Sequence, residues 1–107
     1  MSQGIVDLDR DDIKQGMADG SMVIVDVREP HEFAAGRIPG AVLMALSSFD
    51  PAGLSAFSGK RIVFSCRTGG RTQKAIAIAQ AAGWALNEHY RGSFTDWQAA
   101  GEPIEQG

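Results

Sequence analysis

The 107-residue sequence is poor in the residues that form disulfides and metal centres. It contains one cysteine and two histidines. A single cysteine cannot form an internal disulfide, and it leaves no second thiol in the chain to resolve an oxidised sulfur. Paired ligand spacings such as C-x-x-C or H-x-x-x-H are also missing, so we predict no metal site.

Long apolar runs and an excess of positive charge are missing as well. No run approaches the length of a membrane span, and the first seven residues lack the basic start and apolar core of a signal peptide. The net charge of -3 gives no general attraction to nucleic acid or to an anionic membrane. We therefore expect no nucleic-acid or membrane partner. A reducing cytoplasm is the expected compartment, because it keeps a lone thiol free.

The remaining composition is that of an ordinary globular protein. Hydrophobic residues make up 44% of the chain and charged residues 21%. A chain of this length can bury one modest core. We predict one domain over residues 1–107, without internal repeats or linkers.

The only cysteine lies between an apolar run and a helical pattern. Residues 61–65 predict a short buried strand. Residues 71–82 contain no glycine or proline and predict a helix that ends at Gly83. Cys66 is therefore expected in a strand-to-helix turn.

The residues that follow Cys66 are those of an anion-binding turn. Gly69 and Gly70 allow the backbone to curl and to turn several N–H groups inward at the positive end of a helix dipole. Arg67 and Arg71 add two cations, and a thiol in such a field loses its proton readily. A lone cysteine is more often a small buried hydrophobe, but such a residue needs neither the glycines nor the arginines. The turn predicts a nucleophilic sulfur and an anionic substrate.

Strands and helices are predicted to alternate along the chain. Residues 22–26 are almost continuously apolar and predict a strand in the middle of a sheet, buried on both faces. The other strands are expected at 5–8, 41–44, 61–65 and 85–90, and the helices at 9–20, 30–35, 50–57, 71–82 and 93–101. This order predicts an α/β fold with a mostly parallel five-stranded sheet and helices on both faces.

Three further expectations concern single residues. Asp26 follows a strand at the sheet edge where α/β proteins bind ligands, and we expect it to brace the Cys66 loop rather than to react. Ser93 and Asp96 have the spacing of a capping box that opens the last helix, with Trp97 as a core anchor. The tail over residues 102–107 is expected to fray.

Cys66-Arg67-Thr68-Gly69-Gly70-Arg71-Thr72 resembles the active-site loop of single-domain rhodaneses, the thiosulfate sulfurtransferases. Residues 25–33 and 36–41 are similar to the two upstream signatures of the family, and residues 92–97 to its closing segment. The resemblance covers nearly the whole chain and implies a rhodanese-like fold, with the loop at the carboxyl edge of the sheet and no metal or organic cofactor. The chain departs from the family pattern at Arg37, where a histidine is common, and at Ser93, where a second glycine is common.

The resemblance also implies a reaction. The Cys66 thiolate would attack the sulfane sulfur of thiosulfate or a related small anionic donor, and Cys66 would then carry a persulfide. A thiol, cyanide or a protein thiol would accept the outer sulfur. Arg67 and Arg71 would bind the anionic donor, and the N–H groups of residues 67–72 would hold the charged persulfide.

Two other functions stay open from the sequence. Cysteine-dependent phosphatases and arsenate reductases also use a cysteine in an N–H-lined loop ended by an arginine. Their loop is one residue longer than the four residues between Cys66 and Arg71, and Ser65 stands where they often have histidine. A non-catalytic rhodanese-like binding module is the third possibility, although inactive members usually lack the cysteine.

Overall fold

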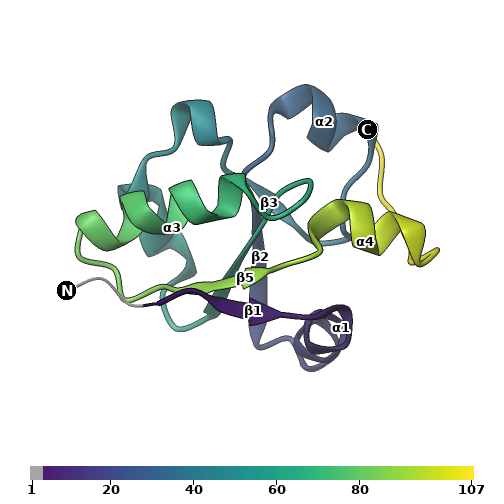
Figure 1. Ribbon diagram of the computed structural model, residues 1–107, viewed down its shortest axis with the longest axis horizontal. Helices are drawn as coiled ribbons and strands as arrows, with labels where there is room; N and C mark the ends of the chain where they lie inside the picture. The colour runs from purple at the N-terminus through teal and green to yellow at the C-terminus, as the bar shows by residue number, and fades with distance from the viewer. Residues whose placement is uncertain (1–3) are drawn as a thin grey trace.

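The computed structural model describes residues 4–107 (Figure 1). Over these residues the strands form one parallel five-stranded sheet in the order β1-β5-β4-β2-β3. The elements are, in chain order, β1 (Val6–Leu8), α1 (Arg10–Asp19), β2 (Met22–Asp26), α2 (Pro30–Ala35), β3 (Val42–Leu43), η1 (Leu46–Ser48), η2 (Pro51–Phe57), β4 (Arg61–Ser65), α3 (Arg71–Ala81), β5 (Glu88–Tyr90) and α4 (Ser93–Ala99). Residues 1–3, part of the N-terminal segment that lacks signal-peptide features, lie outside the described residues.

The predicted α/β architecture is confirmed, with one refinement. The middle strand of the described sheet is β4, the strand that leads into Cys66, while β2 lies between β4 and β3. Parallel strands end at the same edge, so the residues after β2, β4 and β5 come together there. The last strand is shorter than predicted because residues 85–87 lie outside the ladder.

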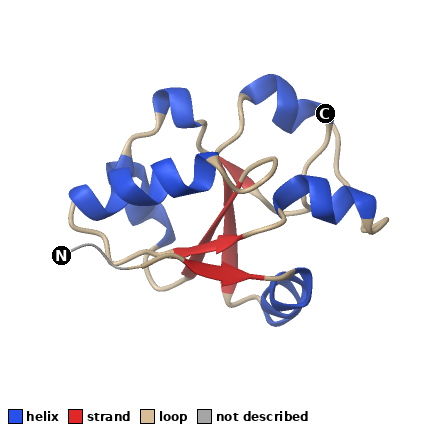
Figure 2. Ribbon diagram, in the orientation of Figure 1, coloured by secondary structure: helices blue, strands red, loops and turns tan. Residues whose placement is uncertain are grey.

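Helices cover both faces of the sheet (Figure 2). Alternation along β4 directs Val63 to one face and Phe64 to the other. The first face packs against α1 and α4, and the second against α3 and η2. Cys66 belongs to the second cluster, together with Val25, Val27, Leu54, Ile62, Phe64, Ala75, Ile76 and Ala79.

Local capping fixes both ends of α1. The carboxylate of Asp9 accepts a hydrogen bond from the N–H of Asp12 at 2.9 Å, and the carboxylate of Asp12 accepts one from the N–H of Asp9 at 3.0 Å. Gly20 closes the helix in the left-handed region, with φ of 73°.

The capping box predicted at Ser93 and Asp96 is wrong. Gly92 is the residue that precedes α4, and Ser93 is its first residue, with φ of 53°. The carboxylate of Asp96 accepts hydrogen bonds from Arg10 and Tyr90 instead of from the start of its own helix. Partners from α1 and β5 have taken the place of the local cap, and both bind the carboxylate of Asp96 by charge-assisted hydrogen bonds.

The C-terminal tail does not fray as predicted. Figure 1 shows the C-terminus beside α2, where the N–H of Gly107 donates to the carbonyl of Ala34 at 2.9 Å. Arg37 and Glu105 exchange two backbone hydrogen bonds, and Trp97, 2% exposed, donates from Nε1 to the carbonyl of Pro103. The tail therefore closes over α2 and α4. Across the described residues, no helix has the length and apolarity needed to cross a membrane.

Candidate active site

Cys66 is the first residue after β4, and it is 1% exposed. Its sulfur accepts a hydrogen bond from the N–H of Gly69 at 3.0 Å, and the hydroxyl of Ser93 lies 3.8 Å away. The N–H groups of Thr68 and Thr72 also donate to it. The turn between β4 and α3 therefore surrounds one sulfur atom with donors, as an anion-binding turn does.

These donors decide the ionisation of Cys66. Burial raises the pKa of the thiol, because it disfavours a charge. The hydrogen bonds from the backbone of Thr72 and Gly69, the hydroxyl of Ser93 and the backbone of Thr68 together outweigh burial, so the pKa lies below its ordinary value of 9.0. A larger share of the sulfur is then present as the nucleophilic thiolate at neutral pH.

Only one of the two loop glycines is required by geometry. Gly69 has φ of 95°, and a Cβ at this position would lie 2.6 Å from the carbonyl oxygen of Arg91. Gly70 has helical dihedral angles, with φ of -83°, and a Cβ there would meet nothing within 4 Å. The tight curl of the loop therefore depends on Gly69.

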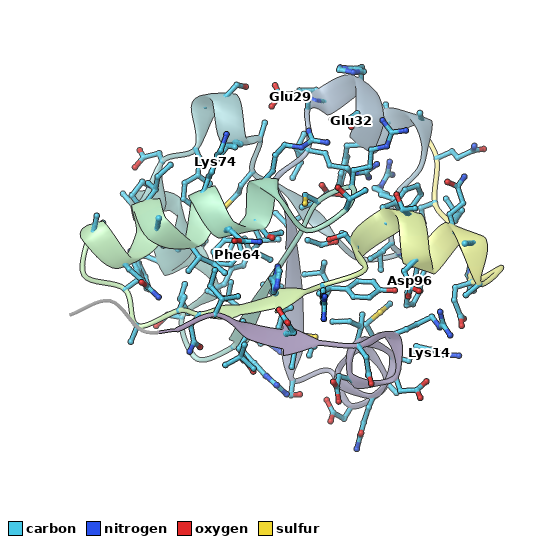
Figure 3. The ribbon with its side chains drawn as sticks, in the orientation of Figure 1. Lys14, Glu29, Glu32, Phe64, Lys74 and Asp96 are labelled. Carbon is cyan, nitrogen blue, oxygen red and sulfur yellow. The ribbon has the colours of Figure 1, made fainter. Side chains whose placement is uncertain are left out.

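Arg71 is paired with a carboxylate that the sequence analysis did not single out. Its guanidinium makes two hydrogen bonds to Glu32, at 2.7 and 2.9 Å, and Glu32 lies on α2 (Figure 3). This bidentate bond lowers the pKa of Glu32 to about 2, against a smaller opposing effect of burial. The cation predicted at position 71 is therefore largely neutralised, whereas Arg67 is exposed on the loop. The available signal was the carboxylate in the first upstream signature, residues 25–33, which follows a strand that ends at the same sheet edge.

We predict that Glu32→Gln lowers the free energy of unfolding by up to about 1 kcal/mol at neutral pH. The folded pKa of Glu32 is below its ordinary value of 4.5, so its contribution is complete above that value and is lost as the pH falls through about 2. Urea unfolding of both proteins across this range measures the effect. The difference should shrink toward zero at the acid end, and a difference that is independent of pH would contradict the ion-pair explanation.

Asp26 does not contact the loop directly. Both of its carboxylate oxygens accept hydrogen bonds from Arg28, at 2.8 to 3.1 Å, and both residues are buried. Arg28 also donates to the carbonyl of Gly36 at 2.7 Å, and its guanidinium lies 4.4 Å from the ring centroid of Phe94. The N–H of Phe94 in turn donates to the carbonyl of Cys66 at 3.0 Å. The bracing role of Asp26 stays a prediction, and the described contacts give it an indirect route through Arg28 and α4.

The guanidinium of Arg37 is not free at the rim of the site, because α2 and the C-terminal tail bind it. It donates to the carbonyls of Phe33 at 3.2 Å and Gly107 at 2.8 Å, and its guanidinium stacks on the ring of Phe33. Its charge thus fastens the C-terminal tail to α2.

Ser93 was missed as a site residue, because its sequence context suggested a helix cap. Its hydroxyl oxygen accepts from the N–H of Cys66 at 3.1 Å, and its proton is shared between the carbonyl of Tyr90 at 2.8 Å and the more distant sulfur. The Gly-Ser pair in place of two glycines was the only signal of this contact.

An open cleft of about 520 Å³ borders the loop at Thr68. Its walls come from the end of β1, the start of α1 and the turn before α4, and they carry Asp7, Asp9, Asp11, Arg10 and Arg91. Across residues 4–107, no three His, Cys, Asp or Glu side chains are grouped so that they could hold a metal ion.

A family model and several known proteins are similar to this chain. The model of the rhodanese-like domain matches residues 9–100. A sulfurtransferase of Allochromatium vinosum is 31% identical over 92% of both chains. A thiosulfate:glutathione sulfurtransferase of Saccharomyces cerevisiae is 30% identical over 80% of this chain and 71% of its own.

The lengths and descriptions of other relatives vary. The chain spans only 46% of the length of a Synechocystis protein to which it is 34% identical. A solved structure from Rhodopseudomonas palustris, described as a possible tyrosine phosphatase, is 30% identical and superposes with a TM-score of 0.77 over 94% of this chain and 85% of its own.

Proposed function

The chain belongs to the rhodanese-like domain family, and we propose that it is a sulfurtransferase that carries sulfur on Cys66 as a persulfide. One observation carries this proposal. The sulfur of Cys66 lies inside a ring of N–H donors that lowers its pKa. Such a ring favours an anionic sulfur both before transfer and after it.

The proposed reaction has two balanced steps. The Cys66 thiolate attacks the sulfane sulfur of thiosulfate, the sulfur–sulfur bond of the donor breaks, and sulfite leaves with the electron pair. Cys66 is left as a persulfide whose outer sulfur is negatively charged. A thiolate or cyanide then attacks this outer sulfur, and the Cys66 thiolate leaves. The N–H groups of Gly69 and Thr72 stabilise the negative charge that returns to the sulfur of Cys66 as this thiolate leaves.

The arginines have different proposed roles. Arg67 is exposed and meets the anionic donor as it approaches. Arg71 is occupied by Glu32, so it orients the loop and interacts with the donor only as part of a neutral pair. The name of the yeast relative, which includes glutathione, supports a small thiol as the acceptor. A protein thiol or cyanide would react by the same chemistry.

A phosphatase is the second candidate, and the description of the Rhodopseudomonas relative favours it. Phosphate monoester hydrolysis needs room for a tetrahedral phosphoryl group over the loop. Only four residues separate Cys66 and Arg71, and Arg71 already binds a carboxylate. Turnover of p-nitrophenyl phosphate tests this function directly.

The mass of the intact native protein after incubation with thiosulfate tests the proposal. We expect a gain of one sulfur atom, reversed by cyanide or by a thiol, because the persulfide is covalent. Thiosulfate and inorganic sulfide should be compared, since only the former is a sulfane donor. No gain with thiosulfate or any other sulfane donor would contradict the proposal.

A further inference from the structure

A hydrogen-bonded chain runs beneath the loop from the exposed carboxylate of Asp7 to two buried side chains, and the reaction described above does not use it. His89 on β5 is 2% exposed, and its Nε2 lies 2.7 Å from Oδ1 of Asp7 on β1. Its Nδ1 lies 2.6 Å from Oγ1 of Thr72 on α3. Asp7 and His89 are partners in the parallel ladder, so both side chains leave the sheet on the same face. The register of the sheet thus fixes the contact between them.

Thr72 connects this chain to the loop at two points. Its hydroxyl oxygen lies 2.9 Å from the carbonyl oxygen of Gly69, and the side chain is fully buried. Its backbone N–H makes the hydrogen bond that lowers the pKa of Cys66 most. A shift of Thr72 would therefore disturb both the closure of the loop and a donor to the sulfur.

The imidazole also supports the loop by packing. A Cβ at Gly69 would lie 3.7 Å from Cε1 of His89, so the ring lies directly below the glycine whose N–H faces the sulfur. A much smaller side chain would leave an unfilled space at this point, and a void forfeits the contacts of the atoms that line it.

Both ring nitrogens of His89 have hydrogen-bond partners. An ionised Asp7 can only accept, so Nε2 donates to it. Nδ1 and the hydroxyl of Thr72 lie at hydrogen-bond distance, and this hydroxyl is also within reach of the carbonyl of Gly69. The same carbonyl accepts from the amide of Gln73 at 3.2 Å. The hydroxyl of Thr72 therefore joins the ring of His89 to the backbone of the loop.

We propose that His89 is a positioning residue for sulfur transfer. Held by Asp7, its ring binds the hydroxyl of Thr72, which in turn lies against the carbonyl of Gly69. The N–H groups of Gly69 and Thr72 then stay directed at the sulfur of Cys66. This inference rests on the proposed function for its kinetic consequence, but its effect on the thiol does not depend on sulfur transfer.

Two replacements of His89 separate this role from simple packing. His89→Asn keeps hydrogen-bonding groups in place of the ring, and His89→Leu fills similar space without any. In the leucine variant we expect the pKa of Cys66 to rise by about one unit and persulfide formation at neutral pH to slow about tenfold, because fewer donors face the sulfur. The asparagine variant should stay within about threefold of the native rate. Thiolate absorbance across a pH series measures the pKa, and the single cysteine makes that signal unambiguous.

Thr72 provides a second test if His89→Leu does not fold. Thr72→Val keeps the shape of the side chain but not its hydroxyl and should reproduce the loss, whereas Thr72→Ser should restore native behaviour. His31→Asn, at an exposed position on α2, is the matched control and should change nothing.

The inference is overturned if asparagine and leucine at position 89 cause equal losses, since His89 would then only fill space. It is also overturned if neither His89→Leu nor Thr72→Val changes the pKa of Cys66. If the native protein transfers no sulfur but both variants raise that pKa, the proposed function fails and the positioning role stands.

Discussion

Cys66→Ser is expected to abolish sulfur transfer from thiosulfate while leaving the fold intact. A hydroxyl is a far weaker nucleophile than a thiolate and cannot carry a persulfide, so we expect a loss of about 10⁴-fold or more. The serine oxygen can still accept the hydrogen bond that Gly69 donates to the sulfur at 3.0 Å. The loop should therefore keep its closure. Steady-state transfer to cyanide and the mass of the intact variant measure the two consequences.

The control for this variant is its stability. Thermal unfolding of the native protein and the serine variant should give similar midpoints, because the replacement is nearly isosteric and keeps a polar atom within the ring of donors. Retained transfer by a correctly folded variant would show that Cys66 is not the sulfur carrier, and loss of the fold would make the kinetic result uninformative for that variant alone. Cys66→Ala then serves as a second replacement, with the same expected loss of activity.

The N–H and O–H groups that bind the sulfur of Cys66 also determine how the reaction rate falls in acid. The pKa of Cys66 lies below 9.0 because the hydrogen bonds to its sulfur outweigh burial. Protonation of the thiolate below that pKa should lower the rate of persulfide formation, and alkaline solutions should not lower it through this group. The donors of the loop therefore set the pH range in which Cys66 reacts.

Much of this site could be predicted because local sequence determines it. The apolar run before Cys66 and the helical pattern after Gly70 place the sulfur at a strand-to-helix turn whatever the rest of the chain does. The Asp9 cap has the same local origin, since its partner lies within four residues.

The residues that sequence reasoning missed depend on contacts between distant segments. Glu32 and Arg71 are 39 positions apart, and Asp7 and His89 are 82 apart. No periodicity or local motif reports such pairs, because the strand order brings them together: β1 lies beside β5, and β2 lies beside β4. At Ser93 the error is the opposite one, because a local motif predicted a contact that does not form. A local capping motif was present, but tertiary partners took both of its polar side chains.

Gly69→Ala is expected to have the second largest effect, because it combines backbone strain with a collision. The residue has φ of 95°, and the added methyl group would lie 2.6 Å from the carbonyl oxygen of Arg91. The loop must move, and its N–H then no longer faces the sulfur. We expect a loss of about 10²-fold in persulfide formation, as for removal of one preorganised donor, and about 1–3 kcal/mol of stability.

Two control glycines separate the causes of this loss. Gly59 lies in the turn before β4 with φ of 86°, and an added methyl group there would meet nothing. Gly59→Ala should therefore lower the free energy of unfolding by about 1 kcal/mol through backbone strain alone, without affecting transfer. Gly70→Ala adds a methyl group beside the loop at helical dihedral angles and should cause a much smaller loss than Gly69→Ala. Urea unfolding and persulfide formation should be measured on all three variants. Equal losses of transfer at positions 69 and 70 would mean that any methyl group on the loop blocks the approach of thiosulfate. The direction of the Gly69 N–H would then not control the reactivity of Cys66.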